Sequence, residues 1–137
     1  GNFTSKLNNL LKVDYKFVLN NINNKNVIIL DARNKERFNG AINEPRANLR
    51  KGHIPKSKNL FWGSLISKQG TILSKNKIIK KLNHYRLYNK NIITSCGSGV
   101  TACILSLVLL HSLKIQSQVY DGSWAEWGLK NKLPIEK

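Results

Sequence analysis

A cysteine in a glycine-containing loop is the feature of this sequence that is best suited to chemistry. Cys96 lies between a β-branched stretch that ends at Ser95 and an apolar run that ends near His111. This pattern indicates a strand that turns into a helix, with the thiol at the turn. A helix N-terminus biases a thiol towards the thiolate and lowers its pKa from about 8.5 into a range of roughly 3.5 to 7.5. We therefore expect a nucleophilic cysteine at this turn.

The residues that follow Cys96 favour a cradle for an anion. Gly97 and Gly99 flank Ser98, and glycine adopts backbone conformations that are closed to other residues. Such a backbone can turn several N–H groups inward, and the helix that follows adds the positive end of its dipole. An anion attached to the cysteine sulfur is expected to be stabilised there.

Elements that could position this cysteine are predicted along most of the chain. Buried strands are expected at residues 27–30, 91–95 and 118–120, with a brief strand near 59–61. Helices are expected at residues 7–22 with Asp14 as a cap, around Arg37-Phe38, at 75–82, and at 100–113 as a buried helix. Strands that alternate with helices indicate an α/β fold with a mainly parallel sheet.

The ends of the predicted strands agree with the position of the cysteine. Ligands in open parallel sheets bind at the carboxyl ends of the strands. Asp31, Cys96 and Asp121 all follow predicted strands. The local pattern and the topological rule therefore place a site at the same edge of the sheet.

Length and composition set the broad class. A chain of 137 residues forms one ordinary domain with a single core. The longest apolar stretch, residues 102–110, is too short to span a bilayer, and no secretory leader is recognisable. The spacing of Cys96 and Cys103 does not suit a disulfide, so we expect a cytoplasmic location, with a mitochondrial one as the alternative. The first residue is Gly1 and methionine is absent, which leads us to expect a piece of a longer protein.

The net charge of +16 is interpreted as a compositional bias, because the basic residues are spread along the chain. Lysine supplies 18 of the 23 basic residues, asparagine is equally abundant, and both are scattered through every segment. A selected anion-attracting surface is the alternative interpretation. Aromatic residues that could stack on bases do not alternate with the lysines, so specific binding of nucleic acid is not favoured.

Several motifs together resemble a known family. The sequence is similar to a rhodanese domain from about residue 27 to residue 128, and the whole chain 1–137 is expected to form one such domain. The stretches that carry the resemblance are Leu30-Asp31-Ala32-Arg33, Gly52-His53-Ile54-Pro55 with Asn59, Cys96-Gly97-Ser98-Gly99-Val100-Thr101-Ala102, and Tyr120-Asp121-Gly122-Ser123-Trp124-Ala125-Glu126-Trp127. The resemblance implies a sulfurtransferase that carries a persulfide on the loop cysteine. It also implies a five-stranded, mainly parallel sheet with helices on both faces.

The loop sequence and two arginines point to one subfamily. The loop Cys-Gly-Ser-Gly-Val-Thr is characteristic of 3-mercaptopyruvate sulfurtransferases. In that subfamily two arginines bind the carboxylate and carbonyl of the substrate, and Arg37 and Arg46 match both their contexts and their spacing. A guanidinium fork suits a planar carboxylate. Gly97, Gly99, Val100 and Thr101 are expected to complete the substrate site with their N–H groups.

The resemblance also implies a reaction and partners. Cys96 is expected to take sulfur from a small anionic donor and to pass it to a thiol, a thioredoxin-like protein or cyanide, without a metal or cofactor. Ser98 is a candidate for proton handling, in a Ser-His-Asp arrangement whose other members come from an N-terminal rhodanese domain. Because the subfamily consists of two tandem domains, this chain is expected to be the C-terminal half and to lack that partner domain.

Other residues near these motifs are expected to be structural. Arg33 and Arg50 are assigned to salt bridges or loop ordering. His53 is interpreted as a structural residue, and Cys103 as a buried helical residue without reactivity.

The same residues exclude one rival function, disfavour a second and leave two alternatives open. A cysteine-loop phosphatase requires an arginine six positions after the nucleophile, and position 102 is alanine, which excludes that class. A binding module without activity is disfavoured because Cys96 and the complete loop are present. A thiosulfate sulfurtransferase and a relay that delivers persulfide for tRNA or cofactor thiolation remain alternatives, although a relay has no need of the two arginines as a carboxylate clamp.

Overall fold

The apolar runs of the sequence pair at the centre of a parallel sheet. The computed structural model describes residues 1–6 and 8–137. β2 (Val27–Asp31) pairs with β4 (Asn91–Ser95), from Val27 opposite Asn91 to Asp31 opposite Ser95. Both strands are covered on both faces, which explains why they read as continuous runs rather than as alternating patterns.

Shorter strands extend this pair on either side. β5 (Ser117–Tyr120) pairs with β4, and β1 (Lys12–Val13) forms the edge beyond it. β3 (Lys58–Asn59) pairs with β2 at the other edge. Within the described residues the order is β1-β5-β4-β2-β3, and these pairings are parallel. The expected five-stranded parallel sheet is confirmed.

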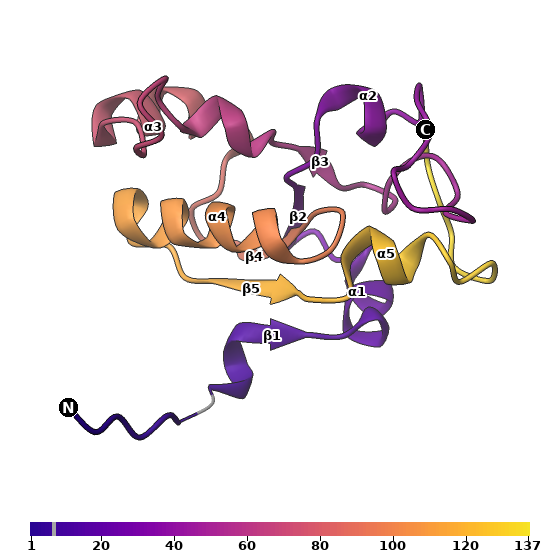
Figure 1. Cartoon of the computed structure of the whole chain (residues 1–137), viewed down its shortest axis with the longest axis horizontal. Coiled ribbons are helices and arrows are strands. Elements are labelled where there is room, and N and C mark those ends of the chain that lie inside the picture. Colours follow the sequence, from indigo (N-terminus) through magenta and orange to yellow (C-terminus); the bar gives the residue numbers. More distant parts are fainter. Residues whose placement is uncertain (7) are drawn as a thin grey trace.

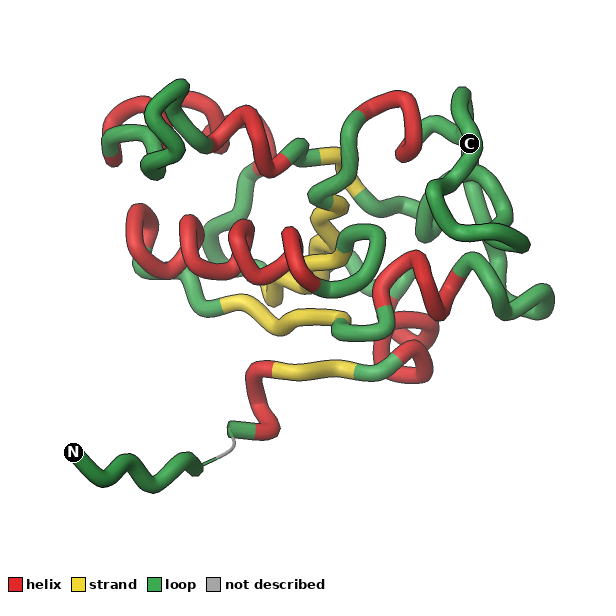
Figure 2. Tube along the Cα trace, viewed as in Figure 1, coloured by secondary structure: helices red, strands yellow, loops and turns green. Residues whose placement is uncertain are grey.

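Helices cover both faces of the sheet (Figures 1 and 2). Successive strand residues point to opposite faces, so Ile28 and Leu30 pack with α3 (Lys75–Leu82) and α4 (Val100–Val108), while Ile29 packs on the side of α1 (Tyr15–Asn21) and α5 (Ser123–Trp127). Shorter helical segments are α2 (Lys35–Phe38), η2 (Trp62–Leu65) and η3 (Asn83–Tyr85). No helix in the part of the chain that the structure describes is long and apolar enough to cross a membrane.

The helix expected at residues 7–22 is wrong over its first half. Leu7 lies outside the described residues. The chain then forms the 3-10 turn η1 (Asn9–Leu11) and the edge strand β1 before α1 begins. Asp14 is the cap of α1, because its carboxylate accepts a hydrogen bond of 2.8 Å from the N–H of Phe17. The cap was correctly predicted, but it starts the helix rather than lying within it.

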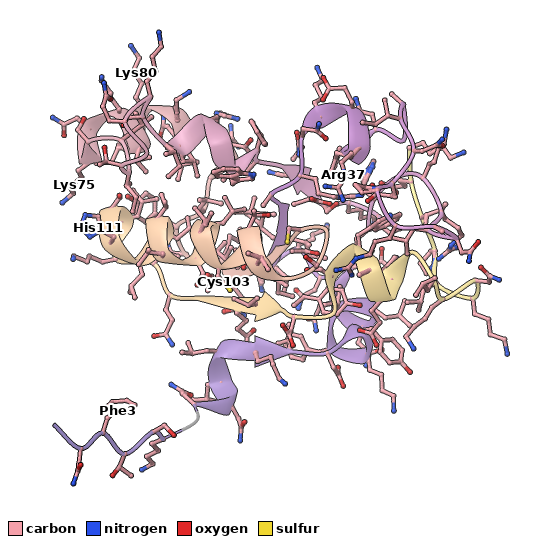
Figure 3. All side chains as sticks on the ribbon, in the orientation of Figure 1. Phe3, Arg37, Lys75, Lys80, Cys103 and His111 are labelled. Carbon is pink, nitrogen blue, oxygen red and sulfur yellow. The ribbon has the colours of Figure 1, made fainter. Side chains whose placement is uncertain are left out.

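The helix expected at residues 100–113 is buried on one side only. It ends as α4 at Val108 and continues as the π-helical turn η4 (Leu109–Leu113). Leu105 and Val108 are fully buried against the sheet, whereas Leu107 is 56% exposed. Cys103 lies on the outer side and is exposed, so its predicted burial is wrong. Its side chain is labelled below α4 in Figure 3, and its thiol donates a weak hydrogen bond to the carbonyl of Gly99 at 3.4 Å.

Arg50 ties the C-terminal segment to the rest of the domain. Its guanidinium donates hydrogen bonds to the carbonyl oxygens of Trp127 at 3.0 Å, Lys130 at 2.7 Å and Leu133 at 2.9 Å. Its Nε also donates to the carbonyl of Gly128 at 3.1 Å. The expected role of Arg50 in ordering a loop is therefore confirmed by its contacts.

Replacing Arg50 with alanine is expected to lower the free energy of unfolding by about 2 kcal/mol, because several carbonyls lose a charged donor. Urea denaturation followed by far-UV circular dichroism measures this change. The matched control Lys80→Ala removes an exposed charge on α3 and should change stability by less than about 0.5 kcal/mol. Equal stability of the two variants would contradict the role of Arg50.

Candidate functional site

The loop after β4 is held from behind by the start of α5. The N–H of Trp124 donates to the carbonyl of Cys96 at 2.9 Å, and the N–H of Ala125 donates to the carbonyl of Gly97 at 2.8 Å. The hydroxyl of Ser123 accepts a hydrogen bond of 3.1 Å from the N–H of Cys96. These contacts direct the first two carbonyls of the loop towards α5, which leaves the following N–H groups available to the cysteine sulfur.

Two glycines allow the loop to pass close to its neighbours. A Cβ at Gly97 would lie 2.8 Å from Nη2 of Arg37. Gly99 has a φ of +86°, and a Cβ there would lie 2.8 Å from the carbonyl oxygen of Asp121. Side chains at these positions would force the loop away from both neighbours. The loop conformation expected from the sequence thus depends on glycine at both sites.

The environment of Cys96 favours its thiolate. Burial raises the pKa of the Cys96 thiol, but hydrogen bonds outweigh that effect and bring the pKa below its ordinary value. The donors are the hydroxyl of Thr101 and the N–H groups of Ser98, Ala102 and Thr101. The Ser98 N–H lies 3.4 Å from Sγ. Donors aimed at a sulfur stabilise its charged form, so the sequence expectation of a lowered pKa agrees with the geometry.

Cys96 opens into a pocket of about 230 Å³. Most of the predicted site residues line this pocket, whereas Gly99 does not and instead supports the turn behind it. The residues that line the pocket are Arg37, Glu44, Pro45, Arg46, Leu49, Cys96, Gly97, Ser98, Val100 and Thr101. The structure therefore brings the cysteine and the two arginines into one cavity.

The two arginines of the pocket have different surroundings. Arg37 comes from α2, its side chain is 24% exposed, and it reaches the pocket at the carboxyl ends of the strands (Figure 3). Arg46 comes from the loop that follows α2 and is exposed. Arg37 is fixed by its neighbours, while Arg46 presents its charge to solvent and to the pocket.

Sequence reasoning missed Glu44 as a residue of the site. The side chain of Glu44 is almost completely buried, and its carboxylate binds both Arg33 at 2.8 Å and Arg37 at 2.5 Å. Arg33 in turn pairs with Asp31 at 2.7 Å, which confirms the expected salt bridge of Arg33. In the sequence, Glu44 served only as part of the Glu44-Pro45-Arg46 context of Arg46 and was given no role of its own. Its place two positions before Arg46, in a chain with only seven acidic residues, was the one available signal.

His53 lies against α2 rather than in the pocket. Its ring stacks on Phe38 with centroids 3.8 Å apart, and Nδ1 lies 2.9 Å from the carbonyl oxygen of Phe38. These contacts agree with the expected structural role. Among residues 1–6 and 8–137, no cluster of three or more histidine, cysteine or acidic side chains could hold a metal ion.

Comparison with known proteins places this site in a family. Residues 14–130 match the family described as "Rhodanese-like domain". The chain belongs to this family. The match thus includes α1, which lies before the span of about 27–128 indicated by the sequence motifs, as well as α5, which lies within it.

Curated relatives of this rhodanese-like domain are sulfurtransferases. It is 40% identical over 120 residues to "Thiosulfate/3-mercaptopyruvate sulfurtransferase 1, mitochondrial" of Arabidopsis thaliana, covering 87% of this chain and 32% of the relative. It is also 40% identical over 109 residues to "3-mercaptopyruvate sulfurtransferase" of Escherichia coli (strain K12), covering 79% of this chain and 38% of that protein. The chain thus spans about a third of the length of these relatives and matches their C-terminal part.

Solved structures share the fold. The Tum1 protein from Saccharomyces cerevisiae superimposes with a TM-score of 0.77 at 31% identity, over 88% of this chain and 44% of that one. The wild-type structure of EanB gives a TM-score of 0.84 over 93% of this chain and 31% of that one. Its identity of 18% supports the fold alone. The rhodanese-like α/β fold predicted from the sequence is therefore confirmed.

The hydroxyl of Thr101 is expected to contribute to the low pKa of Cys96. Because that pKa lies below its ordinary value, the thiolate persists as the pH falls until the folded-state pKa is reached. Thr101→Val removes one donor, so the alkylation profile of Cys96 should move to higher pH. At a pH below the midpoints of both the wild-type and the variant profiles, the variant should be alkylated more slowly than wild type. The difference should be about tenfold for each 1.4 kcal/mol by which the thiolate is less stabilised.

Reaction with iodoacetamide at a series of pH values measures this profile. The variants are made in a Cys103→Ser background, because Cys103 is exposed and would react with the reagent as well. Ser106→Ala, which removes a hydroxyl from the same helix near Ser117, serves as the control and should leave the profile unchanged. An unchanged profile for Thr101→Val would show that the backbone N–H groups act alone.

Proposed function

We propose that this domain transfers sulfane sulfur from 3-mercaptopyruvate to a thiol acceptor through a persulfide on Cys96. The observation that carries the proposal is the meeting of three groups in one pocket: a thiolate-biased Cys96, Arg37 and Arg46. A nucleophile for sulfur and cations for a carboxylate are the two elements that this donor requires. The names of the curated relatives support the same activity.

The first step breaks the carbon–sulfur bond of the donor. The Cys96 thiolate attacks the donor sulfur and forms a sulfur–sulfur bond. The electron pair of the broken bond stays on carbon and leaves as the enolate of pyruvate, which then takes up one proton. Arg37 and Arg46 hold the carboxylate and carbonyl, so that the sulfur points at Cys96 and the developing enolate charge is stabilised. Ser98 lines the pocket, and we assign its hydroxyl to the transfer of that proton.

The second step returns the cysteine to its starting state. An acceptor thiolate attacks the outer sulfur, the sulfur–sulfur bond breaks, and the electron pair returns to Sγ of Cys96. Between the two steps the persulfide anion is held by the N–H groups that already favour the thiolate, which is stabilisation by a preorganised site. The acceptor is a small thiol, a thioredoxin-like protein or cyanide. Gly97, Gly99, Val100 and Thr101 supply or shape this cradle.

A second domain and the choice of donor also belong to the proposed function. The relatives are longer two-domain proteins, so we propose that a preceding rhodanese domain forms the opposite wall of the cleft and supplies partners for Ser98. Relatives named for both thiosulfate and 3-mercaptopyruvate make thiosulfate the alternative donor. Arg37 and Arg46 both line the pocket, and two guanidinium groups can bind the carboxylate and the carbonyl of one donor, which favours the carboxylate donor.

Release of pyruvate from 3-mercaptopyruvate, with a thiol acceptor, tests this function. Wild-type protein should form pyruvate, and Cys96→Ser should form none. Arg46→Ala should raise the KM for 3-mercaptopyruvate by roughly 10- to 100-fold, because a charge-assisted pair contributes about 1.5 to 3 kcal/mol.

Lys75→Ala is the matched control for loss of one positive charge. Lys75 is exposed on α3, at the opposite end of the molecule from Arg37 in Figure 3, and its removal should leave KM unchanged. Thiosulfate is assayed in parallel, and a higher kcat/KM with thiosulfate would assign the alternative donor. A folded protein with a reactive thiol that releases no pyruvate would refute the proposal.

A further inference from the structure

Glu44 is a buried carboxylate that touches one of the two pocket arginines. Its Oε2 accepts hydrogen bonds from Nη2 of Arg37 at 2.5 Å and from Nε at 3.2 Å. Its Oε1 accepts from Nη1 of Arg33 at 2.8 Å. The side chain of Glu44 is 1% exposed. The carboxylate is therefore a fixed counter-charge in the wall of the pocket.

The charges behind this wall cancel one another. Asp31 and Arg33 are both almost fully buried and paired at 2.7 Å. Arg33 also binds Glu44, and Glu44 binds Arg37. The chain of contacts alternates in sign from the end of β2 to the pocket and contains two carboxylates and two guanidinium groups, so its formal charge is zero.

One positive charge is left for the donor. Among the residues that the structure describes, the charged side chains that line the pocket, besides the Cys96 thiolate that every donor meets, are Arg37, Glu44 and Arg46. Glu44 neutralises Arg37, and Arg46 is exposed. A pocket with one uncompensated cation matches a donor with one negative charge, whereas a dianion brings a second charge that has no partner.

We propose that Glu44 sets the donor charge that the pocket accepts, so that monoanionic carboxylate donors are preferred over dianions such as thiosulfate. Glu44 is a specificity-determining and positioning residue, because its carboxylate holds the Nε and Nη2 side of Arg37 and leaves the other end of the guanidinium for the donor. The preference between donors rests on the proposed function. The charge of the pocket does not, and it can be measured without turnover.

The first test compares two donors. Glu44→Gln keeps the shape of the side chain and raises the lining charge by one. The ratio of kcat/KM for thiosulfate to that for 3-mercaptopyruvate should rise about tenfold, since the added charge attracts the dianion more strongly. Glu44→Asp keeps the charge and should keep the wild-type ratio. Glu36→Gln makes the same change of net charge at an exposed position of α2 outside the pocket lining and should also leave the ratio unchanged.

The second test measures pocket charge by alkylation of Cys96 in a Cys103→Ser background. Iodoacetate carries one negative charge and iodoacetamide carries none, so the ratio of their rates reports the charge that Cys96 faces. This ratio should rise several-fold in Glu44→Gln and fall in Arg46→Gln. It needs no sulfur donor. A wild-type protein that fails to release pyruvate would refute the proposed function, while the alkylation ratios would still decide the role of Glu44.

A third comparison covers the case in which Glu44→Gln does not fold, because removing one member of a buried ion pair is costly. The double variant Arg37→Gln with Glu44→Gln removes both partners and leaves Arg33 paired with Asp31. Its alkylation ratio should exceed that of Arg37→Gln alone by several-fold and return to the wild-type value. Circular dichroism confirms that the variants compared are folded. Equal ratios in these two variants, or a fall in both donor activities of Glu44→Gln with no change in their ratio, would overturn the proposal and leave Glu44 a purely structural residue.

Discussion

The hydrogen bonds that converge on the Cys96 sulfur depend on how closely the backbone approaches its neighbours. Gly97 passes directly beneath the guanidinium of Arg37, and Gly99 turns against the carbonyl of Asp121 with a positive φ. The start of α5 fixes the loop from the other side by binding its carbonyl groups. A side chain at Gly97 would therefore displace Arg37, and one at Gly99 would displace the N-terminus of α4 from Asp121. Either change would disturb the hydrogen bonds to the thiolate. The chemistry of the pocket follows from this close packing of backbone.

The buried charges beside the pocket are not explained by stability. Removing an ion from water costs several kcal/mol even when it is paired, and apolar residues of similar volume often give an equally stable protein. Asp31, Arg33 and Glu44 are nevertheless almost inaccessible to solvent. What the network provides is a guanidinium held in one orientation at Arg37 and a pocket whose remaining charge comes from Arg46. Preorganisation of this kind removes the cost of ordering a flexible arginine when the donor binds.

The sequence predicted those parts of the molecule that depend on local pattern. The strands around Ile29 and Ile93 and the position of Cys96 follow from apolar runs and glycine placement, and the capping role of Asp14 follows from its side chain. β1 could not be found this way, because its two residues form a strand only by pairing with β5, which is distant in sequence. The exposure of Cys103 was missed because a continuous apolar run does not reveal which side of a helix faces the sheet. Glu44 was missed because its significance lies in two arginines that only the fold brings to it.

Above all, we propose that Sγ of Cys96, surrounded by the N–H groups of its loop, is the atom that accepts the sulfur. Intact-mass spectrometry of the protein after incubation with 3-mercaptopyruvate, without any acceptor, tests this most directly. We expect a mass gain of one sulfur atom, matched by one equivalent of pyruvate, that fragmentation of the peptide assigns to Cys96 and that disappears when a thiol acceptor is added. A protein that gains no sulfur, or that gains it on Cys103, would contradict the account.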